Sequence, residues 1–198
     1  MFARHCQINF AFNLIFLTIN ILRYGDKNKF LGRLPLAWLN KLLQRLRGDQ
    51  QVFILRRSAG FAYSFLSLLR ADPVDCERTL LPVAMESLLS TIKLGIHKNC
   101  NTVHWKLCVH SMNVLRLLIG DATVGPALNP YITQCVQYSV QGFESERWAV
   151  RNSSMMVFTA VVQRSVDVDK NDSGGSSAGK ATFSPLIASI LQTLAYYL

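Results

Sequence analysis

The fold is decided by residues 103–119, which read VHWKLCVHSMNVLRLLI and are followed by Gly120. Steps of four and three residues repeat along one face of an α-helix, so this stretch predicts a helix with one core-facing side. The residues on that side are Val103, Leu107, His110, Val114 and Leu117. A glycine directly after the last apolar residue is typical of a helix end.

The same pattern recurs on both sides of this stretch, separated by short gaps. Further helices are predicted over residues 8–23, 35–47, 52–70, 76–95, 128–142, 147–165 and 185–198. Alternating strand patterns are nearly absent. Eight amphipathic helices joined by short loops predict an all-α fold, a HEAT- or armadillo-like α-solenoid segment of antiparallel helix pairs. A globular helical bundle is the alternative.

Composition divides the chain into four parts. Residues 1–25 are expected to form an atypical N-terminal apolar helix, and residues 26–166 a HEAT-like helical core. Residues 167–181 are rich in Ser, Gly, Asp and Lys and predict a flexible loop. Residues 182–198 are expected to form a C-terminal helix that is apolar nearly all round. Because solenoids need polar terminal repeats, we expect a fragment of a longer protein whose last repeat is truncated.

The N-terminal apolar run is too short and too polar for a typical membrane span. It covers residues 8–22 and contains Asn9, Asn13 and Asn20, whereas a span needs about 20 predominantly apolar residues. A core helix is therefore favoured and no membrane contact is expected. A signal peptide or membrane anchor is the alternative.

Positive charge is concentrated in the first third of the chain. Residues 1–70 contain eleven Lys and Arg against two acids, whereas residues 71–198 contain ten of each. This asymmetry predicts an anionic partner, either nucleic acid or an acidic protein, and the alternative is a solvated face with no partner. Nine of the eleven basic residues lie between residues 27 and 70, and they are Lys27, Lys29, Arg33, Lys41, Arg45, Arg47, Arg56, Arg57 and Arg70.

The first arginine motif is RRSAG at residues 56–60, on a helix whose other face is apolar. The residues expected to contact an RNA phosphate or a protein partner are Arg56, Arg57, Ser58, Gly60, Tyr63 and Arg70. Gly60 permits a close backbone approach, and Tyr63 can stack on a base. The alternative is a surface pair of arginines held by acidic residues elsewhere.

The second motif is WAVRNSS at residues 148–154, which opens an otherwise apolar helix. A helical wheel places Arg151 in the stripe that also contains Met155, Phe158 and Val162. An unpaired buried guanidinium is very costly, so Arg151 must find a carboxylate, backbone carbonyls or a polyanion.

A structural role is favoured for this second motif. Trp148 is expected to anchor helix packing, and Arg151 to pair with a carboxylate such as Asp121 or Glu144. Asn152 and Ser153 would then satisfy backbone groups of the loop. Direct contact with a partner is the alternative.

Metal binding and catalysis find little support. The candidate ligands are His97, Cys100, His104, Cys108 and His110, but their spacing matches no zinc module and His110 is expected to face the core. No glycine-rich phosphate loop follows a strand, and HExxH and paired carboxylates are missing from the sequence. The chain is therefore not expected to be an enzyme.

Five cysteines without a CxxC pair indicate a reducing compartment, and we expect a cytoplasmic protein.

Several motifs together resemble the thyroid-adenoma-associated protein family, in its DUF2428-type central block. They are RRSAG at 56–60, VHSMNVLR at 109–116, GF at 142–143, WAVRNS at 148–153 and Arg164. The likeness covers about residues 34–165. The family usually continues its first motif as Gly-Leu-Pro, whereas Phe61-Ala62 follows Gly60 here.

The resemblance implies a non-catalytic scaffold that supports ribose 2′-O-methylation of the tRNA anticodon loop. Such a scaffold binds tRNA and a partner methyltransferase, and S-adenosylmethionine lies on that partner, so no cofactor is expected on this chain. The residues expected to shape the scaffold are His110, Asn113, Arg116, Trp148, Arg151 and Asn152. The alternatives are a protein-interaction scaffold without an RNA role, in calcium handling or energy metabolism, and a non-functional truncated fragment.

Overall fold

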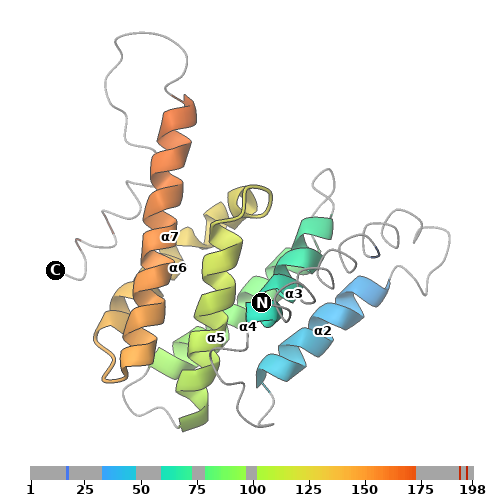
Figure 1. The fold of residues 1–198 in the computed structure, drawn as a ribbon, viewed down its shortest axis with the longest axis horizontal. Coiled ribbons are helices and arrows are strands. Elements are labelled where there is room, and N and C mark those ends of the chain that lie inside the picture. Colours follow the sequence, from blue (N-terminus) through green and yellow to red (C-terminus); the bar gives the residue numbers. More distant parts are fainter. Residues whose placement is uncertain are drawn as a thin grey trace, which may run out of the picture.

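The computed structural model describes residues 33–47, 59–72, 79–96 and 102–172, together with Leu17, Gln192 and Ala195. Within these residues every regular element is a helix (Figure 1). The helices are α2 (Leu34–Arg47), α3 (Ala59–Ala71), α4 (Leu80–Ile96), α5 (Thr102–Ile119), the 3₁₀ helix η3 (Gly125–Tyr131), α6 (Ile132–Phe143) and α7 (Trp148–Asp172). The prediction of an all-α protein is confirmed for the described part of the chain.

Consecutive helices form the main packing units. The most extensive contacts join α4 to α5 and α6 to α7, and α5 also packs against α7 and α3 (Figure 1). One apolar core runs through all of these contacts. Its fully buried side chains include Leu39, Phe65, Leu69, Met85, Ile92, Met112, Leu115 and Val157.

The buried side of α5 is wider than the sequence predicts. His110 and Val114 are buried as expected, but Val103 and Leu107 are only half-buried. The most deeply buried side chains of this helix are Cys108, Ser111, Met112, Val114, Leu115, Leu118 and Ile119. Because α4 and α7 both pack against α5, a single apolar stripe cannot describe its burial.

Two helix boundaries differ from the prediction. The helix expected from residue 128 begins as η3, since Pro126 and Pro130 lack the N–H groups that α-helical hydrogen bonds require. Helix α7 continues to Asp172, so the first residues of the predicted loop 167–181 are helical. Glycine and proline do not occur between residue 148 and Gly174, and a helix already formed extends at little cost.

The predicted terminal segments lie largely outside the described residues. This applies to residues 1–25 except Leu17, to residues 173–181, and to residues 182–198 except Gln192 and Ala195. Among the described helices, none is both long and apolar enough to cross a membrane.

Glycine allows a close approach at two helix crossings. A Cβ at Gly142 would collide with the Ser154 hydroxyl and lie 3.0 Å from the Ser154 Cβ, where α6 meets α7. A Cβ at Gly95 would collide with the Cys108 Cβ and lie 3.2 Å from the His104 carbonyl carbon, where α4 meets α5. A larger residue at either position would therefore displace one helix from the other.

Candidate functional site

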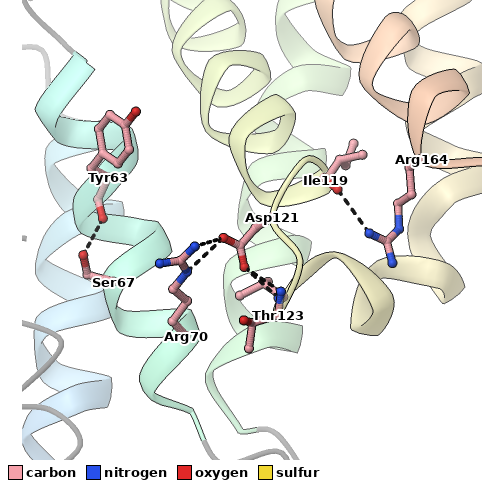
Figure 2. A network of polar contacts seen from close by, with 8 residues as sticks. Tyr63, Ser67, Arg70, Ile119, Asp121, Thr123 and Arg164 are labelled. Carbon is pink, nitrogen blue, oxygen red and sulfur yellow. Dashed lines mark hydrogen bonds and ion pairs between the residues drawn. The ribbon is translucent and has the colours of Figure 1, made fainter. Parts of the chain in front are cut away.

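An ion pair joins α3 to the loop after α5 (Figure 2). The Arg70 Nε donates to the Asp121 Oδ2 over 2.8 Å, and the Arg70 Nη2 donates to the same oxygen. The other carboxylate oxygen, Oδ1, accepts the N–H groups of Thr123 at 3.0 Å and Val124 at 2.9 Å. Both oxygens of Asp121 are thus satisfied, and the same carboxylate fixes both the turn and the end of α3.

Burial and hydrogen bonding act in opposite directions on Asp121. Burial of the carboxyl raises its pKa, but hydrogen bonds from Arg70, Val124 and Thr123, with the charge of Arg70, hold the pKa below its ordinary value. The Asp121 side chain is 3% exposed and that of Arg70 is 40% exposed. The negative charge is therefore hidden behind a guanidinium that still reaches solvent.

An open groove of about 530 Å³ lies beside this ion pair, bounded by α3, the end of α5 and α7. It brings together three of the predicted residues, Tyr63, Arg70 and Arg116. Tyr63 is 42% exposed, and Arg116 is exposed and its guanidinium makes no hydrogen bond or ion pair to another described residue. The apolar part of the lining consists of Leu66, Leu117, Met155, Met156 and Ala160.

A second, polar surface lies on α2. Its exposed basic residues are Arg33, directly before the helix, and Lys41, Arg45 and Arg47 within it. The Arg47 Nη2 donates to the Ser87 Oγ of α4 over 3.0 Å. A groove of about 450 Å³ between α2 and α4 adds Asn40, Gln44 and Glu86 to this surface. In Figure 1, α2 and α7 lie on opposite sides of the molecule.

The first arginine motif is only partly described. Arg56, Arg57 and Ser58 lie outside the described residues. Gly60 is half-buried in the first turn of α3, and its carbonyl accepts the Ser64 hydroxyl over 3.0 Å. The predicted contact roles of this motif stay predictions.

The second motif differs from the prediction at its two largest side chains. Trp148 is 70% exposed and so does not anchor helix packing. The Arg151 Nη1 donates to the backbone carbonyls of Ser145, at 2.7 Å, and Glu146, at 2.9 Å, instead of pairing with Asp121 or Glu144. The physical reason is that Arg151 lies in the first turn of α7, within reach of the carbonyls of the preceding loop. Asp121 is already paired with Arg70.

The small side chains of this motif form the contact of α7 with α5. The Ser153 hydroxyl donates to the Val150 carbonyl at 3.0 Å and lies 3.2 Å from the Met112 sulfur. The Ser154 hydroxyl lies 3.4 Å from the same sulfur. Asn152 is exposed, with its amide nitrogen 3.9 Å from the Met156 sulfur, so neither Asn152 nor Ser153 satisfies the loop backbone as expected.

The other predicted residues of α5 occupy different environments. His110 is buried at 7% exposure, Asn113 is half-buried, and Arg116 is exposed at the groove. No group of three His, Cys, Asp or Glu residues suited to a metal occurs within the described part of the chain. His97 and Cys100 lie outside that part.

Three contacts of charged side chains were not foreseen from the sequence. Asp121 was assigned to Arg151 rather than to Arg70, although the turn that follows Gly120 is a typical place for an aspartate that binds backbone N–H groups. The Arg147 guanidinium carbon lies 5.2 Å from the ring centre of Trp105, which connects the loop before α7 to α5. The Arg164 Nη1 donates to the Ile119 carbonyl at 3.5 Å (Figure 2).

Comparison with known proteins identifies the family. A model of the THADA/TRM732 family, DUF2428, matches residues 15–149. The chain belongs to this family. It is 30% identical over 158 residues to the mouse protein named "tRNA (32-2'-O)-methyltransferase regulator THADA", which covers 78% of this chain. It is also 30% identical over 135 residues to the fission yeast protein named "tRNA (32-2'-O)-methyltransferase regulator trm732", which covers 68% of this chain.

The matched region is a small part of those relatives. It spans 8% of the mouse protein and 9% of the fission yeast protein. The human relative is 29% identical over 181 residues, which is 85% of this chain and 9% of the human protein. These THADA/TRM732 relatives are named as regulators of a methyltransferase, and no solved structure gives a significant match to the chain.

Proposed function

We propose that this chain is part of a non-catalytic adaptor that supports ribose 2′-O-methylation of the tRNA anticodon loop. The observation that carries the proposal is membership of the THADA/TRM732 family, whose relatives are named as regulators of a tRNA 2′-O-methyltransferase. In this function the chain binds tRNA and a partner methyltransferase in the cytoplasm. S-adenosylmethionine is bound by the partner.

The exposed basic face of α2 is the surface that we assign to tRNA. Arg33, Lys41 and Arg45 are exposed there, and long basic side chains of this kind neutralise backbone phosphates without reading sequence. Arg56 and Arg57 add to this charge in the sequence, next to α3. Binding that depends on phosphate contacts weakens steeply as salt increases.

The contribution of the adaptor to the reaction is positioning. We propose that the helices form a segment of a HEAT-like solenoid, whose extended surface holds the tRNA and the enzyme together. Holding two reactants in one complex removes much of the entropy cost of their encounter.

Co-capture at two salt concentrations tests the proposal. The full chain is incubated with labelled tRNA and the partner methyltransferase at low and high salt. We expect both to be captured, with tRNA lost at high salt, and the double variants Arg56→Ala/Arg57→Ala and Lys41→Ala/Arg45→Ala to weaken tRNA capture. The charge-matched control is Lys93→Ala/Lys106→Ala, two exposed lysines of α4 and α5 outside the lining of the groove between α2 and α4, which should leave capture unchanged.

Other outcomes separate the alternative functions. Capture of the methyltransferase without any salt-dependent tRNA affinity would favour a protein-interaction scaffold without an RNA role. Capture of neither by soluble, folded protein would identify a fragment without the family's function. In a full-length homologue, the counterpart of Arg56→Ala/Arg57→Ala should lower tRNA methylation without unfolding the protein, and unchanged methylation would contradict the role of this motif.

A further inference from the structure

The groove beside Arg70 exposes two positive charges and no accessible negative charge. Asp121 is the only acidic residue of its lining, and its side chain is 3% exposed behind Arg70. Arg70 keeps 40% of its side chain exposed, and Arg116 is exposed and its guanidinium makes no hydrogen bond or ion pair to another described residue. A guanidinium that a buried carboxylate already holds in place loses little entropy when it binds a second anion.

An apolar ridge on α7 adjoins this groove. Trp148, Met155 and Val162 are 70%, 53% and 38% exposed, and their spacing of seven residues places them on one side of the helix. Met155 belongs to both the ridge and the groove. The ridge spans about 21 Å from Trp148 to Val162, the length of about four turns of a partner helix.

The composition of this surface favours protein over RNA. Of the large apolar side chains that the described residues leave exposed, four lie here: Tyr63, Trp148, Met155 and Val162. Aromatic residues, methionine and arginine are enriched at protein interfaces, and they supply most of the binding energy there. The α2 face, in contrast, exposes mainly basic and amide side chains, with Leu36 and Ala37 as exceptions.

We propose that the groove and the ridge together dock an amphipathic helix of a protein partner, with apolar residues of that helix on Met155 and Trp148 and a carboxylate bound by Arg70 and Arg116. An amphipathic helix presents anchors at steps of three and four residues, which matches a ridge parallel to α7. The two exposed arginines select an acidic helix. The inference rests on the proposed function in one respect, that the chain has a protein partner.

Binding by groove variants tests this inference. The affinities of the full chain for the partner methyltransferase and, separately, for tRNA are measured for the wild type and for Met155→Glu, Arg116→Glu and Arg116→Ala. The matched control is Lys93→Glu, a charge reversal at an exposed position of α4. Thermal melting by circular dichroism verifies that each variant folds.

We expect Met155→Glu and Arg116→Glu to weaken methyltransferase binding at least about tenfold and to keep tRNA affinity within about twofold. Arg116→Ala should have a smaller effect in the same direction, and Lys93→Glu should change neither affinity. Unchanged methyltransferase binding in the folded groove variants would overturn the inference. Loss of tRNA affinity with retained methyltransferase binding would overturn it as well and assign the groove to RNA.

A designed peptide separates failure of this inference from failure of the proposed function. If the wild-type chain binds neither methyltransferase nor tRNA, the proposed function fails. The groove is then tested with a 14-residue helical peptide of about four turns, which has a leucine stripe and flanking glutamates, and with its lysine-flanked counterpart. A preference of about tenfold for the glutamate peptide that is reversed by Arg116→Glu supports the groove as a docking site, and equal or absent binding overturns it.

Discussion

Two regions of this molecule hold an arginine in different ways. At the junction of α3 with the loop after α5, Arg70 donates to a carboxylate 51 residues away that is almost fully buried. At the corner between α6 and α7, Arg151 donates to carbonyls only five and six residues away, in an exposed loop. The first contact connects distant elements, whereas the second closes a local turn. An arginine in a helical motif therefore contributes more to the stability of the fold when its acceptor is buried.

The corner between α6 and α7 depends on small side chains, and one substitution there should have the largest effect. Gly142→Val would force a side chain into Ser154 and Met112, so we expect a loss of about 3 kcal/mol in unfolding free energy. Chemical denaturation followed by circular dichroism measures it. Gly120→Ala is the matched control, because a Cβ there meets no atom closer than 3.5 Å. An unchanged midpoint for Gly142→Val would show that this crossing is not tightly packed.

Removal of the buried carboxylate should have the next largest effect. Asp121→Ala loses the Arg70 contacts and two backbone hydrogen bonds, and we expect a loss of about 2 kcal/mol, because Arg70 is left partly solvated rather than buried. A double-mutant cycle should find coupling of Asp121 with Arg70 and none with Arg151. Coupling between Asp121 and Arg151 would contradict the arrangement described above.

Acidification should weaken the same junction by a smaller amount. The pKa of Asp121 is lower in the folded protein than in the unfolded chain, so its contribution is fully present above the unfolded pKa of about 4. It is lost as pH falls from there through the folded pKa. Unfolding free energies measured between pH 7 and pH 3 should therefore fall more steeply for the wild type than for Asp121→Asn. Parallel curves would show that this carboxyl has an ordinary pKa.

The exposed residues of the second motif should have the smallest effect on stability. Trp148→Ser and Arg151→Ala remove side chains that face solvent, and we expect changes of less than about 0.5 kcal/mol in unfolding free energy. Thermal melting measures both variants. A large loss for Arg151→Ala would mean that the local turn is as important as the buried ion pair.

The sequence predicted the helices better than their contacts. Periodicity placed α5 to within one residue, because its apolar spacing and Gly120 are both local properties. The partner of Asp121 was not predictable in this way, since α3 and the loop after α5 are far apart in the sequence and come together only in the folded structure. Trp148 was expected to anchor helix packing but is 70% exposed, and the contact of α7 with α5 is made by Ser153 and Ser154.

The candidate site was predicted in part. Tyr63 and Arg70 came from a helical wheel and Arg116 from a motif of the family resemblance, and the structure adds Met155 to the same groove. That these residues share one groove does not follow from spacing, because they lie on three different helices. The position of Asp121 behind Arg70, which decides the accessible charge of the groove, also required the folded arrangement.

The buried thiol of Cys135 gives the protein a built-in reporter of local opening. This side chain lies within α6, and burial raises its pKa to about 12, so the reactive thiolate is scarce at neutral pH. An alkylating reagent reaches the sulfur only when α6 separates transiently from its neighbours. The rate of modification at Cys135, followed by mass spectrometry of the peptide that contains it, therefore measures how often this part of the native structure opens.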